Sequence, residues 1–136
     1  MAGSSTVTKS DITVNGRITR KVLTIAWTGA AAGGAIDAIT INPVTYGIEG
    51  WYLYTVETNP GTTAPTDNYG IAVNDADGLD IAGALLAGRD ATATEIVNIG
   101  TSNHGYPVVR SNLSVAISSN SVNSATGTII MVFLSE

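Results

Sequence analysis

The chain has 136 residues, only 12% of them charged, and a formal net charge of −5. This length suits one domain built on a single core. From Val22 onward only Arg89 and Arg110 are basic, which excludes a nucleic-acid-binding face on the body of the protein. There is no cysteine, so disulfides and thiolate metal sites are excluded. No apolar run is long enough to span a bilayer, and the first residues lack a signal peptide, so we expect a soluble protein made in the cytosol, without a membrane partner.

Small polar and aliphatic residues dominate the composition, which is typical of an all-β protein and not of a helical enzyme. We predict a single antiparallel β-sandwich or jelly roll over residues 17–136, preceded by a flexible, extended arm over residues 1–16. The arm is rich in Ser and Thr and alternates only weakly, so we expect it to order on a partner. About eight short strands are expected, in chain order 17–27, 35–41, 47–57, 69–73, 79–81, 95–99, 113–117 and 126–134.

The turn between Val73 and Ile81 can be predicted in detail. A two-residue turn at Asp77-Gly78 would set Asp75 directly opposite Asp80, and like charges in that position destabilise a strand pair. A type I turn with Gly78 in the left-handed conformation, closed by a bulge, instead pairs Val73 with Ile81 and residue 74 with Asp80. We therefore predict the bulged hairpin.

Two strands carry large apolar side chains on both faces. In 47–57, Tyr52, Tyr54 and Val56 alternate with Trp51 and Leu53, and the strand 126–134 is apolar on both sides as well. A two-layer sandwich buries only one face of each sheet, and the mean hydropathy is a high +0.24, so we expect a homo-oligomer. The residues predicted at its interface are Trp51, Ile129, Met131 and Phe133.

Two segments carry a family resemblance. The segment APTDNYGIAVNDADGLD (64–80), followed by Gly83 and by GRD (88–90), resembles small virion proteins of tailed bacteriophages, and so does NSATGT (123–128) before the apolar last strand. The resemblance covers most of the chain from 21 to 134. It implies a β-sandwich decoration or cement protein on the phage head surface, made in the host cytoplasm, often trimeric, with the major capsid protein as partner. It brings no catalytic residue and no cofactor.

A metal site and an enzyme are the weaker interpretations. Asp75, Asp77 and Asp80 invite a calcium site, but Gly78 follows Asp77 at once and no glutamate closes the loop at the EF-hand spacing, so we expect a solvated acidic turn without metal. His104 is the single histidine and has no constellation to join. Glu49 and Glu57 would stand about 26 Å apart along one strand, too far for a glycosidase pair. We expect no enzymatic activity.

Two surface features suggest binding. Trp51, Tyr52 and Tyr54 could stack on sugar rings, which makes a receptor- or glycan-binding adhesion module, on a head fibre or the tail, the alternative function. Charge is also polarised, because four of the six basic residues fall within the first 21 positions. We expect these four to dock the arm on an acidic capsid surface, although protection of an edge strand would explain Arg17, Arg20 and Lys21 equally well. They are Lys9, Arg17, Arg20 and Lys21.

Overall fold

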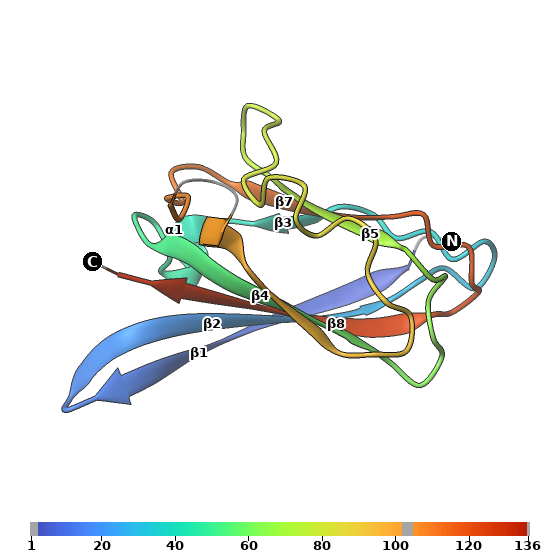
Figure 1. Cartoon of the computed structure of the whole chain (residues 1–136), viewed down its shortest axis with the longest axis horizontal. Helices are drawn as coiled ribbons and strands as arrows, with labels where there is room; N and C mark the ends of the chain where they lie inside the picture. Colours follow the sequence, from blue (N-terminus) through green and yellow to red (C-terminus); the bar gives the residue numbers. More distant parts are fainter. Residues whose placement is uncertain (1–2, 102–104, 136) are drawn as a thin grey trace.

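A computed structural model of the chain describes residues 3–101 and 105–135 and consists of two packed antiparallel sheets (Figure 1). The five-stranded sheet has the order β1-β2-β8-β4-β6, and the three-stranded sheet has the order β3-β7-β5. The predicted all-β sandwich is therefore confirmed. The strands are β1 (Ser4–Val14), β2 (Arg17–Thr28), β3 (Ile39–Ile41), β4 (Tyr52–Pro60), β5 (Gly70–Asn74), β6 (Glu95–Asn98), β7 (Leu113–Ser118) and β8 (Thr126–Leu134).

Helical structure within the described residues is limited to two short elements. α1 (Pro43–Tyr46) is one turn, capped by the Asn42 side chain, which accepts a hydrogen bond from the Val44 N–H, and ended by Gly47 in the left-handed conformation. The second element is the 3₁₀ turn η1 (Ile99–Thr101). Neither is long or apolar enough to cross a membrane.

The core lies between the two sheets and follows the period-two alternation of the strands. Leu23, Ile25 and Trp27 of β2 point inward, as predicted, and each is at most 2% exposed. The three-stranded sheet supplies the facing layer. Its buried side chains are Ile39, Ile41, Ile71, Val73, Leu113 and Val115.

The predicted turn register is confirmed. Asn74 pairs with Asp80, the Ile81 N–H donates to the Val73 carbonyl at 2.8 Å, and Gly78 has a φ of 84°. The returning segment is shorter than predicted, because residues 79–81 form this single bridge and then turn away. The register thus avoids an Asp–Asp pair, as the charge argument requires.

The predicted faces of the strand around Tyr54 are wrong. A bulge places Tyr54 as an extra residue, because Leu53 pairs with Phe133 while Thr55 pairs with Val132. The alternation therefore reverses, and Leu53 and Val56 are both fully buried in the same core. Tyr54 lies on the other side of the sheet.

The expected flexible arm is also corrected. Residues 4–14 form β1, which pairs along its whole length with β2 and stands at the edge of the five-stranded sheet. Its side chains are exposed except at Val7, which is partly buried against the core. The arm is therefore half of a hairpin that extends past the body of the sandwich, at the left of Figure 1.

The predicted oligomer-interface residues of the last strand lie in the core. Ile129, Met131 and Phe133 are fully buried between the sheets, so they cannot contact another chain. Because both faces of β8 are apolar, alternation alone could not tell which one points inward. Trp51 is half-buried, just before β4. His104 lies outside the described residues.

Candidate functional site

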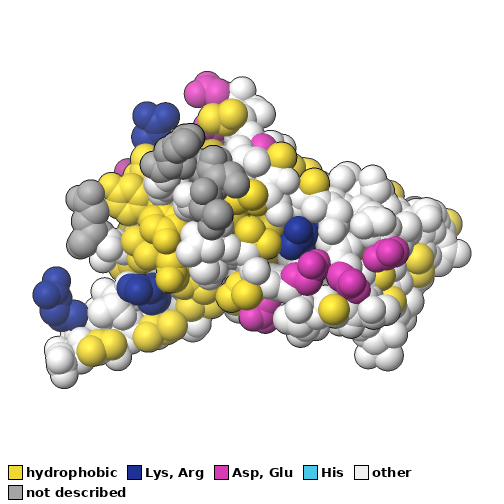
Figure 2. All heavy atoms as spheres, viewed as in Figure 1, with side chains coloured by type: hydrophobic (Ala, Val, Ile, Leu, Met, Phe, Trp, Pro, Cys, Tyr) yellow, Lys and Arg dark blue, Asp and Glu magenta, His cyan; other side chains and the backbone are white. Residues whose placement is uncertain are grey.

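The most prominent surface feature is the projecting end of the β1–β2 hairpin. We define the hairpin end as Ile12, Val14, Arg17, Ile18 and Arg20. Its three aliphatic side chains are 42–53% exposed, and their grouping on one ribbon, unlike a single exposed apolar residue, marks a candidate contact. Figure 2 shows Lys and Arg side chains on this end of the molecule, whereas most of the acidic side chains in that view lie on the other half. Apolar surface and positive charge therefore meet on one projecting ribbon.

The predicted docking residues differ in how far they are already engaged. Arg20 lies over the Tyr54 ring at 5.5 Å, and Lys21 lies over the Trp51 ring at 5.2 Å and 3.7 Å from the Asp11 carboxylate. Arg17 and Lys9 are exposed and make no ion pair within the described part of the chain. The structure brings Arg17, Arg20 and Lys21 to one end, while Lys9 lies further along β1.

A second exposed feature is the solvent side of the five-stranded sheet. We define the outer face as Val22, Tyr52, Ile96, Ile130, Val132 and Leu134. These residues are partly exposed, and Ile96 on the edge strand β6 is 66% exposed. Arg20 and Tyr52 both pair across the sheet with Leu134, so the outer face is continuous with the hairpin end. This face replaces the buried β8 residues as the candidate protein contact.

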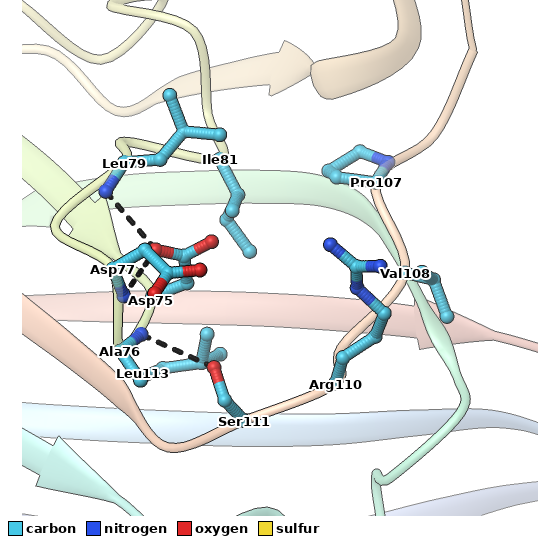
Figure 3. Close-up of a pocket in the computed structure, with 10 residues that line it drawn as sticks. All are labelled: Asp75, Ala76, Asp77, Leu79, Ile81, Pro107, Val108, Arg110, Ser111 and Leu113. Carbon is cyan, nitrogen blue, oxygen red and sulfur yellow. Dashed lines mark hydrogen bonds between the residues drawn. The ribbon is translucent and has the colours of Figure 1, made fainter.

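The acidic turn lines an open cleft of about 590 Å³, opposite the segment 107–113 (Figure 3). Arg110 faces the turn across the cleft, and no described carboxylate lies within ion-pair distance of it. The Ala76 N–H donates to the Ser111 hydroxyl at 3.1 Å and fixes one wall. The other side chains that line the cleft are mostly apolar. The cleft therefore combines an apolar lining with one guanidinium on one side and the carboxylates of the acidic turn on the other.

Two of the three calcium candidates serve the backbone. One carboxylate oxygen of Asp75 accepts from the N–H groups of residues 77 and 79, at 2.9 and 3.0 Å. Asp80 accepts from the N–H groups of residues 73, 82 and 84 and so anchors the turn to β5. The Asp77 carboxylate has no such role in the described structure. Within the described residues, no three His, Cys, Asp or Glu side chains form a group that could hold a metal. The acidic cluster is accounted for by turn formation.

The GRD segment is likewise structural. Arg89 is 8% exposed, and its guanidinium donates to the carbonyls of Leu85 and Ala87 and lies 3.7 Å from the Glu95 carboxylate. Hydrogen bonds from the N–H groups and hydroxyl of residues 92 and 93 lower the pKa of the Asp90 carboxyl. The sequence segments that carry the family resemblance therefore build β5, the start of β8 and the loops beside them.

The aromatic candidates are packed by their neighbours. Tyr54 meets Tyr106 edge-on, with ring centroids 5.2 Å apart, and a cation lies over Tyr54 and over Trp51. A sugar ring could stack on these two rings only from their remaining sides.

Sequence reasoning missed the apolar part of the hairpin end. The signal was present, since Ile12 and Val14 alternate with Asp11 and Thr13. It was missed because four of the five residues of the hairpin end precede the first predicted core strand or lie at its start.

No family model matches the chain, and no curated protein matches it significantly. Among solved structures, the chain is similar to a chain of a cyanophage Pam1 capsid asymmetric unit, with a TM-score of 0.45 and 17% identity over 99% of this chain and 87% of that one. Similarity of this degree does not establish a common function.

Proposed function

We propose that this protein is a structural, non-enzymatic component of a phage virion: a decoration or cement protein that binds the major capsid protein on the head surface and stabilises the lattice as a homo-oligomer. The observation that carries the proposal is the hairpin end, in which exposed aliphatic side chains and Arg17 stand together on a ribbon outside the body. Such a combination suits a partner surface that is acidic and partly apolar.

Two further observations support the proposal. The sequence resembles small phage virion proteins over segments that form β5, the start of β8 and the loops beside them. The outer face extends the apolar surface of the hairpin end across the sheet, so the capsid shell or a neighbouring subunit could cover both together. Because its body is acidic and its hairpin end is basic, the protein would also be oriented by the electrostatic field of an acidic capsid surface as it approaches.

The test is rebinding of the purified protein to expanded, protein-stripped heads of the phage that encodes it. Arg17→Ser removes an exposed charge that makes no described ion pair, so we expect weaker binding at low salt and a shallower dependence of affinity on salt. Arg110→Ser is the matched control, because it removes an equally exposed charge from the cleft. Equal occupancy of the wild type and Arg17→Ser across the salt series would refute docking through the hairpin end.

A triple variant extends the test. Arg17→Ser, Arg20→Ser and Lys21→Ser together should remove most of the salt sensitivity, with circular dichroism as the folding control because two of these cations stack on aromatic rings. Deleting residues 1–16 is a poorer test, since it also removes β1 from the sheet.

Receptor or glycan binding is the alternative. It is less well supported, because cations already lie over the Trp51 and Tyr54 rings. Binding on a glycan array with no affinity for stripped heads would favour it over the decoration role.

A further inference from the structure

The strand β1 has a feature that the docking role does not use. It is 11 residues long, it is the edge strand of the five-stranded sheet, and its outer edge pairs with no described strand. Edge strands are commonly short or protected by proline or by charges, because an open edge can pair with another chain. β1 contains no proline, and its only charged residues are Lys9 and Asp11.

Burial does not explain β1 either. All its side chains are exposed except Val7, which is partly buried, so the strand adds little to the core. The bulge in the hairpin places its extra residue, Thr19, on β2, because Ile12 pairs with Arg20 and Thr13 with Ile18. β1 itself therefore keeps an unbroken alternation and presents a regular edge.

We propose that β1 pairs antiparallel with β1 of a second copy of this chain, about a two-fold axis at Ser10, and joins the two five-stranded sheets into one. With a two-fold axis perpendicular to the sheet, both copies keep their inner faces on the same side. Residues directly opposite each other in an antiparallel pair point to the same face, so their sequence numbers must differ by an even number. The axis therefore lies midway between one residue and the same residue of the second copy.

Charge selects the position of the axis. An axis at Lys9 would set Lys9 against Lys9, and an axis at Asp11 would set Asp11 against Asp11. An axis at Thr8 leaves both residues opposite neutral side chains. Only the axis at Ser10 places Lys9 opposite Asp11 of the partner subunit and, by symmetry, Asp11 opposite Lys9 of the partner subunit. β1 is thus charge-complementary to itself in one register.

The existing ion pair strengthens this choice. Asp11 already lies 3.7 Å from Lys21 on β2, its cross-strand partner. In the proposed pairing Asp11 would lie between Lys21 on one side and Lys9 of the partner subunit on the other. Positive and negative charges would then alternate across the joined strands, and Lys9, which makes no ion pair in the described chain, would acquire one.

The pairing uses the backbone edge of β1, so the side chains of Ile12 and Val14 stay on the faces of the joined ribbon. In this register residues 6–14 of each copy pair, with Thr6 opposite Val14. The contact uses the edge of the strand and leaves the outer face unoccupied. It is isologous and closes as a dimer.

Engineered disulfides test the register, because the chain has no cysteine of its own. Directly paired residues have Cα atoms about 4.5–5.5 Å apart, which a disulfide can bridge. Ser10→Cys should therefore form a covalent dimer under mild oxidation. Thr8→Cys alone should not, but should link to Ile12→Cys when the two variants are mixed. If Ser10→Cys links no faster than Thr8→Cys, or if the mixed pair fails to link, the proposal is overturned.

A charge swap tests the specificity without new bonds. Lys9→Asp should weaken self-association about tenfold by sedimentation equilibrium, since it replaces two attractive pairs with two repulsive ones. The triple variant Lys9→Asp, Asp11→Lys and Lys21→Asp should restore it, because Lys21 is the cross-strand partner of Asp11 and its charge must be reversed as well. Thermal unfolding of each variant is the folding control, because Lys9 is exposed. A wild-type monomer at all concentrations, or Lys9→Asp associating as tightly as the wild type, would exclude the pairing.

Discussion

Gly127 in β8 lies directly opposite Trp27 of β2, and the buried indole covers it. A β-carbon at position 127 would lie 2.6 Å from Cζ2 and 2.7 Å from Cε2 of the ring, about 1 Å inside normal contact. Trp27 is 2% exposed and packs against the Tyr69 ring at 6.0 Å, so it has little room to move away. Gly127→Ala should therefore destabilise the fold.

The cost can be estimated from two opposing effects. Overpacking a core costs about 1–3 kcal/mol, whereas replacing Gly by Ala recovers about 0.4–1 kcal/mol by restricting the unfolded chain. We expect a net loss of about 1–2 kcal/mol in the free energy of unfolding, or about 3–10 °C in Tm for a chain of this size. Equilibrium urea unfolding, followed by circular dichroism, measures the change.

Gly70→Ala is the matched control. Gly70 also lies within a strand, but a β-carbon there would meet only the Ser118 hydroxyl, at 2.9 Å, and a hydroxyl can rotate away. This variant should stay within about 1 kcal/mol of the wild type. If Gly127→Ala proves as stable as Gly70→Ala, the indole does not confine position 127 and the packing argument is refuted.

Three further predictions concern the acidic loops. Asp80→Ala should lose about 2–4 kcal/mol of stability in urea unfolding, because three backbone N–H groups lose their acceptor, while Asp77→Ala should be neutral; equal effects would contradict this. The hydrogen bonds that Asp90 accepts hold the pKa of its carboxyl below its ordinary value, so the stability contributed by this carboxylate is present above the ordinary pKa and is lost as the pH falls through the folded pKa. The Tm gap between the wild type and Asp90→Asn should therefore shrink on acidification, and a constant gap would argue against it. Millimolar calcium should leave Tm unchanged, since Asp75 and Asp80 are engaged with the backbone; a rise that Asp77→Ala abolishes would reverse this conclusion.

The turn register could be predicted because it depended on a local repulsion between two side chains close in sequence. Asp75 and Asp80 could not oppose each other, and this alone chose the bulged turn. The buried face of β2 could also be predicted from the sequence, because the side chains of its other face are polar or small. A local feature can thus be predicted when a single interaction determines it and both interacting residues can be identified in the sequence.

The remaining errors have a common physical origin. The bulge at Tyr54 shifts the faces of β4 because of how β8 pairs with it, and no residue type marks that site. The choice between the two apolar faces of β8 is made by the position of the second sheet. The sequence of β1 predicts an arm, because this strand is held by its pairing with β2 and not by a buried face. Each of these depends on contacts between distant segments.

The strand order of the large sheet has a consequence for biosynthesis. β8 lies between β2 and β4, yet it follows all the other described strands in the chain. The β1–β2 hairpin and the β4–β6 pair therefore cannot join into one sheet until residues 126–134 have been made. Until then β2 is paired only with β1, and the pairing of β8 with two distant strands is non-local and therefore slow. The edges of β2 and β4 that β8 occupies therefore stay unpaired until β8 is made, a state in which unpaired strands are prone to aggregate. The five-stranded sheet is thus completed by the insertion of one central strand.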